Sequence, residues 1–447
     1  VSYGEVGNDG INSSLWSQNW EATSDKRYQG AVNGAFLPSY SLGADMANKD
    51  LKWETTITRN IGVDFGFFNS RLTGTIDAYW NTTKDLLMKT AIPGITGFTS
   101  TYANVGQTSN KGIEIALQGV LVKTRDWNVT AGFNINFNRG KVDKLADNVT
   151  GLYGTEWATS STFPKSDYVL KEGRPVGLVR GLTADGFYTT DDFTYENGVY
   201  ILKEGVADVS SAVFPNYHLH NGMNERPAGQ LAYPGMAKFK DLNDDGIIND
   251  DDVDVIGDMT PVHTGGFNIN ATYKNFDLGL YFNWSYGNEI YNVNKLAALY
   301  GYKEGAVYEN KLSIVKDCYK IYDVVNGELV ALTTPEQLNA ANANAKLPLA
   351  YSENGYVSTL GIEDGSYLRL NTLTLGYTLP KSMLQKAGIS NLRVYGSIYN
   401  VFTITGYSGI DAEVSTSTST KTYPQLGMDW GTYPRARSFV LGVNLSF

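Results

Sequence analysis

The main feature of the sequence is a period-two alternation of apolar and polar residues along most of the chain, whereas helical periodicity is scarce. Successive side chains of a β-strand point to opposite faces, so this pattern predicts strands with one apolar and one polar face. The clearest strand covers residues 127–138, where almost every second residue is large and apolar. Comparable strands are expected at residues 54–67, 71–80, 113–118, 267–273, 278–284, 367–379, 392–404 and 435–447. Most of these strands have the length of about ten residues that crosses a bilayer at a tilt.

The connections between the expected strands fall into two alternating classes. Short links are expected at Phe68–Arg71, Val122–Asp126, Lys274–Asp277 and Pro380–Asn391. Long irregular segments are expected at Asn81–Lys111, Arg139–Pro175, Gly287–Asp364 and Gly406–Arg435. A soluble β-sandwich would show the same alternation within its strands, but it rarely holds several loops beyond about 15 residues. The pattern therefore favours an all-β, transmembrane antiparallel β-barrel with short periplasmic turns and long extracellular loops.

The end of the chain supports the same interpretation. The last strand places Phe439, Leu441, Val443, Leu445 and Phe447 on one face, and the chain stops on that aromatic residue. Outer-membrane barrels commonly end in this way, because the final strand closes the barrel. Counting strands back from this end places the long segments outside the cell. The chain begins at Val1 inside what looks like a strand, so residues 1–447 are expected to be the C-terminal part of a barrel whose first strands are absent.

Composition narrows the choice of protein class. Aromatic residues make up 13% of the chain and charged residues only 18%, which is below the roughly 25% of an ordinary soluble protein. No apolar run approaches the ~20 residues that a membrane-spanning helix needs. The net charge of -10 argues against a nucleic-acid partner, because phosphate binding needs clustered Lys and Arg. The single cysteine, Cys318, excludes an internal disulfide.

One segment has the spacing of a calcium-binding loop. The expected oxygen ligands are Asp241, Asn243, Asp245, the backbone carbonyl of Ile247, and Asp252, with Gly246 at the sharp turn. Because residues 235–240 look like a strand and not a helix, we expect a structural Ca²⁺ site and not a switch. The alternative is a cluster of Asx-turns in which the acids bind their own backbone. The loop lies within residues 187–262, which are expected to form an extracellular insertion.

Several ordered motifs resemble the SusC/RagA family of TonB-dependent outer-membrane transporters. They are Asn60–Phe68, Ala103–Gly106, Asn110–Glu114, Lys238–Gly246, Tyr367–Pro380 and Tyr407–Glu413. One departure is Ala412, where the family usually has proline. The resemblance implies a 22-stranded barrel with an N-terminal plug, in the outer membrane of a Gram-negative bacterium. It also implies a SusD-like surface lipoprotein as partner, coupling to TonB–ExbB–ExbD, and import of oligosaccharides or peptides.

No set of residues suggests an enzyme, and transport needs no catalytic group. Two other functions stay open, namely a passive porin and a calcium-dependent surface glycan-binding protein. Aromatic side chains on the outer loops could stack on a ligand, although such residues more often pack the loops. The candidates for ligand contact are Trp157, Tyr407, Tyr423 and Trp430.

Overall fold

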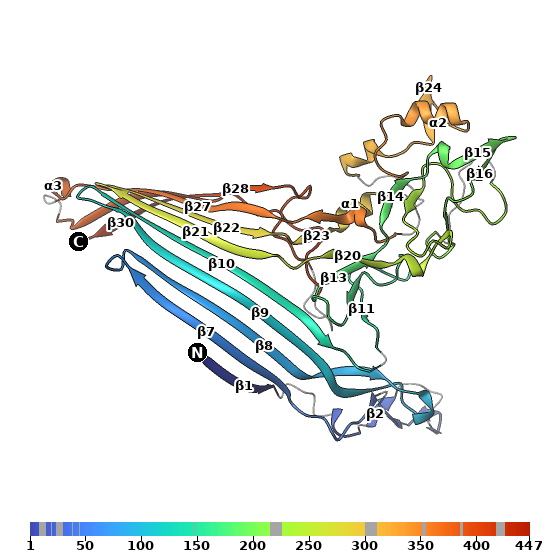
Figure 1. The fold of residues 1–447 in the computed structure, drawn as a ribbon, viewed down its shortest axis with the longest axis horizontal. Coiled ribbons are helices and arrows are strands. Elements are labelled where there is room, and N and C mark those ends of the chain that lie inside the picture. The colour runs from blue at the N-terminus through green and yellow to red at the C-terminus, as the bar shows by residue number, and fades with distance from the viewer. Residues whose placement is uncertain are drawn as a thin grey trace. The chain divides into compact units, whose positions relative to one another are not determined.

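A computed structural model (Figure 1) describes residues 1–8, 15–18, 20–23, 30–37, 39–43, 45–147, 149–214, 226–299, 311–350, 355–384, 388–416 and 425–447. The chain forms two compact units. Unit 1 comprises Val1–Leu152, Leu170–Val176 and His263–Gly279. Unit 2 comprises Tyr153–Val169, Gly177–Val262 and Leu280–Phe447.

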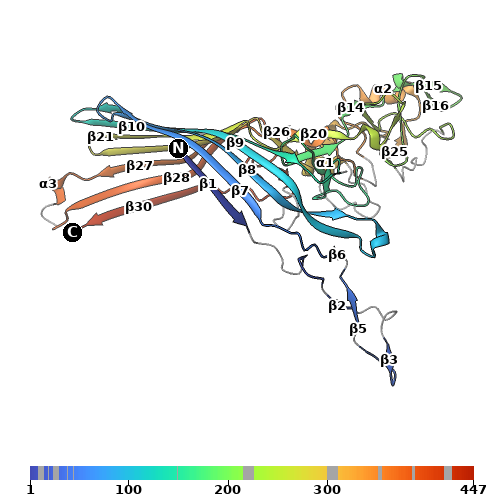
Figure 2. The ribbon, with the colours of Figure 1, turned by 60° about the horizontal axis from the view of Figure 1, so that its bottom comes forward.

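Unit 1 is built from long antiparallel strands that lie side by side in the order β1-β7-β8-β9-β10-β21 (Figure 2). Their bounds are β1 (Ser2–Asn8), β7 (Glu54–Phe67), β8 (Leu72–Ala91), β9 (Ser100–Lys123), β10 (Trp127–Lys144) and β21 (His263–Tyr273). Shorter strands precede β7, namely β2 (Trp20–Thr23), β3 (Ala31–Val32), β4 (Ala35–Phe36), β5 (Ser39–Leu42) and β6 (Asp45–Met46). The pairing keeps alternate residues on one face, so Trp127 on β10 is directly opposite Tyr273 on β21, with ring centroids 4.4 Å apart.

Unit 2 combines further long strands with folded connections. The long strands, in the order β22-β27-β28-β30, are β22 (Phe276–Tyr286, which begins in unit 1), β27 (Tyr367–Thr378), β28 (Asn391–Thr405) and β30 (Ser438–Ser446). The connections hold β11 (Leu152–Gly154), β12 (Tyr168–Leu170), β13 (Leu178–Gly181), β14 (Ala184–Phe187), β15 (Phe193–Glu196), β16 (Val199–Leu202), β17 (Asp208–Val209), β18 (Ala237–Phe239), β19 (Ile247–Ile248), β20 (Asp254–Asp258), β23 (Glu289–Asn292), β24 (Tyr322–Val325), β25 (Glu328–Ala331), β26 (Ile362–Asp364) and β29 (Met428–Asp429).

Helices are few and short. They are α1 (Val293–Leu299), α2 (Pro335–Asn342) and α3 (Lys381–Leu384), together with single 3₁₀ turns. Within the described part of the chain, no helix has both the length and the hydrophobicity needed to cross a membrane.

The structure confirms the expected strands and the alternation of short and long connections, with one correction. Residues 81–111, expected as a long irregular segment, mostly continue strands β8 and β9, which pair as far as Ala91 and Ser100. The prediction was wrong because the register shifts twice, between Thr83 and Leu86 and between Leu86 and Leu87. Each shift breaks the period-two alternation that makes a strand recognisable in sequence.

Apolar side chains are exposed on the long strands and buried in the connections. On β30, Phe439 is 72% exposed and Leu441 is 89% exposed. By contrast, residues from the connections, such as Tyr291, Leu296 and Val357, are fully buried in one hydrophobic core within unit 2. A water-soluble protein rarely exposes apolar rows of this size, whereas strands that face lipid do so by necessity.

Two tyrosine rings cover glycines on neighbouring strands. Tyr79 on β8 pairs directly with Gly112 on β9, and Tyr395 on β28 pairs directly with Gly442 on β30. A Cβ atom added at either glycine would collide with the facing tyrosine ring. The missing glycine side chain therefore makes room for an aromatic ring that covers the exposed backbone, which stabilises the pairing of the two strands.

This packing predicts that Gly112→Ala destabilises the protein more than Gly119→Ala does. At Gly112 the new methyl group would meet the backbone oxygen of Phe137 at 2.5 Å, whereas at Gly119 the nearest atom is 3.7 Å away. We expect Gly112→Ala to lower the free energy of unfolding by about 1–3 kcal/mol, the usual cost of overpacking. The measurement is urea unfolding of the whole protein in detergent micelles. Equal effects of the two substitutions, which lie on the same strand, would contradict this account.

Candidate functional site

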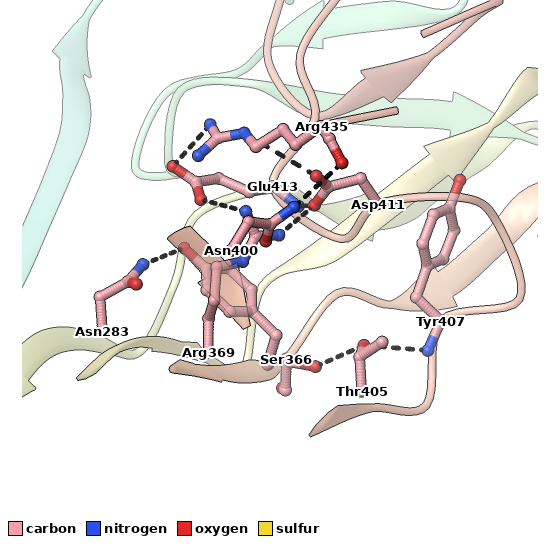
Figure 3. Close-up of polar contacts among 10 residues, drawn as sticks. Asn283, Ser366, Arg369, Asn400, Thr405, Tyr407, Asp411, Glu413 and Arg435 are labelled. Atoms are coloured by element: carbon pink, nitrogen blue, oxygen red, sulfur yellow. Dashed lines mark hydrogen bonds and ion pairs between the residues drawn. The ribbon is translucent and has the colours of Figure 1, made fainter. Parts of the chain in front are cut away.

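A buried arginine on β27 anchors the connection that follows β28. The side chain of Arg369 is only 2% exposed. Its guanidinium forms an ion pair with the carboxylate of Asp411 and contacts Glu413 Oε2 through Nη1 at 3.3 Å (Figure 3). A second arginine, Arg435, approaches the same carboxylates from the far end of the connection, with Nη2 3.0 Å from Glu413 Oε1. Two arginines and two acids therefore join both ends of the segment 406–437 to β27.

The burial of this network determines its effect on stability. Removing charges from water is costly, and the attraction between them compensates only when the geometry is good and the remaining polar atoms are satisfied. Backbone contacts extend the network, because Asn400 donates from Nδ2 to the carbonyl oxygen of Arg435 at 3.0 Å. The network therefore contributes mainly by fixing one position for the connection, and its disruption would leave a buried charge without a partner.

Tyrosine and acidic side chains hold the same connection at further points. Tyr407 donates its hydroxyl to Asp429 Oδ2 at 2.6 Å, and both residues are buried. Burial, with the bond to Asp429, raises the pKa of Tyr407, which keeps its hydroxyl neutral and able to donate. Glu363 accepts hydrogen bonds from the backbone and hydroxyl of Ser408. Burial alone would raise the pKa of Glu363, but these bonds and Lys295 outweigh it and lower that pKa.

The four aromatic candidates for ligand contact lie in different surroundings. Trp157 packs edge-on against Tyr291, with ring centroids 6.5 Å apart, and adjoins the hydrophobic core. Tyr407 is 6% exposed and is engaged with Asp429, whereas Trp430 is 48% exposed. Tyr423 lies outside the described residues. Ligand contact by these residues stays a prediction, and Trp430 is the most exposed of the three candidates that the structure describes.

The calcium-type loop folds around hydrogen bonds from its own backbone. Asp241 accepts the N–H of Gly246 at 2.7 Å, and Asp245 accepts the N–H of Ile247 at 2.8 Å. The amide of Asn243 donates to Asp245 Oδ2 at 3.0 Å. These are the bonds of Asx-turns, and they also hold several oxygen ligands on one short turn.

The last expected ligand in that loop, Asp252, is fully buried. Its carboxylate accepts the N–H groups of Leu242 and Asn249 at 2.7 and 2.8 Å. In the part of the chain that the structure describes, no group of three or more His, Cys, Asp or Glu side chains is placed to hold a metal ion. The Ca²⁺ site therefore stays a prediction.

Sequence reasoning missed the buried ion network, although a signal was present. Arg369 is a charged residue in the middle of the apolar run Tyr367–Leu370. A charge in a membrane-type strand is costly and therefore marks a partner or a polar interior. Its partners Asp411 and Glu413 are separated from it by a whole strand and a loop, so the sequence alone does not identify them.

The network predicts that Asp411→Ala loosens the segment 406–437. Without Asp411, the buried charge of Arg369 keeps only its longer contact with Glu413, and we expect a loss of about 3 kcal/mol in unfolding free energy. The measurements are thermal unfolding of the whole protein in detergent and the rate of proteolysis within 406–437. The control is Glu204→Ala, because Glu204 is exposed in unit 2. If the two variants behave alike, the network does not anchor the connection.

The amino-acid sequence is similar to those of several known receptors. A family profile described as "TonB dependent receptor-like, beta-barrel" matches residues 14–223. TonB-dependent receptor P3 of Formosa agariphila is 30% identical over 456 residues, which cover 100% of this chain and 39% of the relative. TonB-dependent receptor SusC of Bacteroides thetaiotaomicron is 29% identical over 408 residues, which cover 90% of this chain and 32% of the relative.

Solved structures show the same fold. The structure of the RagAB peptide transporter superposes with a TM-score of 0.67 at 24% identity, covering 100% of this chain and 40% of that chain. The RagAB peptide importer in its "closed-closed" state gives 0.68 at 24% identity, with the same coverage. The chain thus spans between about a third and two fifths of the length of these relatives. The profile, the relatives and the fold agree with the motifs in the sequence: the chain is part of an outer-membrane β-barrel similar to that of the TonB-dependent receptors, SusC among them.

Proposed function

We propose that the whole protein that carries this chain is a TonB-dependent active importer of oligosaccharides or peptides. The main support for the proposal is that the connections between the long, membrane-type strands fold into a compact structure. These connections have a hydrophobic core of their own in unit 2, centred on residues such as Tyr200, Tyr233 and Leu296. A passive pore needs only short or simple loops, whereas a rigid body can bind a large ligand.

The proposal includes two protein partners. A SusD-like lipoprotein would cover the long connections, which face outside the cell in our strand count, and TonB–ExbB–ExbD would supply energy. The description of the RagAB structure as a peptide transporter supports peptides as cargo. The naming of SusC as a TonB-dependent receptor supports the coupling to TonB. The rivals are a passive porin and a calcium-dependent surface glycan-binding protein.

Energised uptake separates these three functions. Cells that express the whole protein with its partners would be given fluorescently labelled tryptic peptides of casein or labelled malto-oligosaccharides. We expect saturable uptake of at least one probe, abolished by a protonophore, because TonB coupling needs the proton gradient. Cells with the empty vector are the control. Uptake that persists with the protonophore indicates a porin, and label that stays on the surface indicates a glycan-binding protein.

We further propose that the loop Asp241–Asp252 binds Ca²⁺. The expected ligands are all oxygen atoms, which is the donor type that Ca²⁺ prefers. The turn at Gly246, with φ of 84°, supports the proposal because a calcium-binding loop of this type has glycine at its sharp turn. Bound Ca²⁺ would hold Asp241, Asn243 and Asp245 on one centre and stiffen the segment between β18 and β20.

The Ca²⁺ proposal predicts that the ion raises the unfolding temperature of the whole protein in detergent. At a concentration 100 times the Kd, the gain would be about 2.7 kcal/mol. Asp241→Asn should abolish most of this gain, since it removes one of the expected charged ligands. Asp244→Asn is the matched control, because Asp244 lies in the same turn at a position with no expected ligand role and has a positive φ that Asn tolerates. Absence of any gain for the unsubstituted protein would leave the Asx-turn cluster as the explanation.

A further inference from the structure

A polar pocket lies entirely within unit 2, between the segment 160–166 and β13. Its volume is about 530 Å³, within the usual range of small-ligand sites. Its wall carries hydroxyl groups and charged groups close together. The residues that matter here are Ser160, Ser161, Lys165, Ser166, Arg180 and Asp250.

Arg180 is the central group of this pocket. It is partly buried on β13, and its Cζ lies 4.8 Å from the centroid of the Tyr153 ring. Its Nη1 donates to Ser166 Oγ at 2.8 Å. Burial lowers the pKa of Arg180, but an arginine stays charged at neutral pH. Among the described residues, the guanidinium of Arg180 forms no ion pair within 4.0 Å, so most of its five donors are not engaged by an acid.

The pocket wall is held in place before any ligand arrives. The buried carboxylate of Asp167 accepts the N–H groups of Glu156, Trp157 and Ala158 at 2.8, 2.8 and 3.1 Å. The carbonyl oxygen of Asp167 in turn accepts the N–H of Arg180 at 2.9 Å, which joins the segment to β13. A site that is already ordered loses little conformational entropy on binding.

The charges of the pocket select the class of ligand. Arg180 and Lys165 supply two positive charges and Asp250 one negative charge, in a chain whose net charge is -10. The flat guanidinium matches a carboxylate with two parallel hydrogen bonds, and the tyrosine ring keeps its plane fixed. The serine hydroxyls can bond to amide or sugar groups next to that carboxylate.

We propose that this pocket binds the carboxylate of an acidic oligomer, with Arg180 as the main contact and Lys165 as the second. The carboxylate can belong to a peptide or to a uronic-acid sugar, because Arg180 would form the same paired hydrogen bonds with either. The idea that the ligand is imported cargo rests on the proposed importer function. Binding of a carboxylate to the purified protein does not depend on that function. The pocket would thus favour acidic members among the oligosaccharides or peptides carried.

Binding to the purified whole protein tests the proposal. The probes are N-acetyl-trialanine with a free C-terminus and trigalacturonate, with N-acetyl-trialanine amide and maltotriose as their neutral counterparts, measured by calorimetry. We expect at least one carboxylate probe to bind at least tenfold more tightly than its neutral counterpart, and the affinity to fall with added salt. The probe that binds identifies the source of the carboxylate. Failure of both carboxylate probes, or equal binding of charged and neutral probes, overturns the proposal.

Variants assign the binding to this pocket. We expect Arg180→Gln to weaken binding at least tenfold, and Lys165→Gln to weaken it about threefold, since Lys165 is exposed and screened. Arg174→Gln is the control, because Arg174 is exposed and does not line the pocket. If Arg180→Gln does not fold, Lys165→Gln decides, because that side chain is exposed and its replacement leaves the core unchanged. Unchanged affinity in the folded variants overturns the proposal, whereas intact binding without uptake refutes only the importer function.

Discussion

The whole structure depends on one constraint, the need of backbone N–H and C=O groups for partners where there is no water. In the hydrocarbon layer of a membrane, an unpaired group costs several kcal/mol, so strands must be paired along their full length. Strands β7 to β10 meet this need by long antiparallel pairing, for example from Asn128↔Lys123 to Lys144↔Gln107, with register shifts at a few bulges. Many side chains that these strands expose, such as Ile61, Val63 and Ile113, are apolar, so the hydrophobic effect contributes to folding mainly in the connections.

That division explains where the hydrophobic core lies. The connections are long and leave the lipid, so they bury their apolar residues as a soluble domain does. Tyr188, Tyr200 and Tyr233 meet in this core, with centroids of the rings of Tyr200 and Tyr233 5.3 Å apart. Where the connection 406–437 meets β27, a small apolar cluster of Ile290, Tyr407 and Ala412 remains, and the charged contacts of Arg369 and Arg435 lie at the same junction.

The sequence predicts the long strands well and the connections poorly, for a physical reason. A strand with one apolar face repeats every two residues, so β10, β21 and β30 are visible in the pattern alone. Bulges remove that signal, as in β8 near Asp85, which has a φ of 59°. The network of Arg369 and the pocket at Arg180 depend on residues far apart in the chain. The calcium-type spacing is visible in sequence, but spacing does not distinguish a ligand from a backbone acceptor.

Buried and half-buried aspartates connect the acidic composition with the order of the connections. Asp167 accepts three backbone N–H groups, and Asp208 accepts those of Val209, Leu231 and Ala232. Asp252 accepts two more from its own loop. Each carboxylate satisfies donors that no sheet pairs, so short loops can be buried and ordered without regular structure. Because Asp252 belongs to this group, its burial is explained without a metal ion, and the proposed Ca²⁺ site depends on Asp241, Asn243 and Asp245.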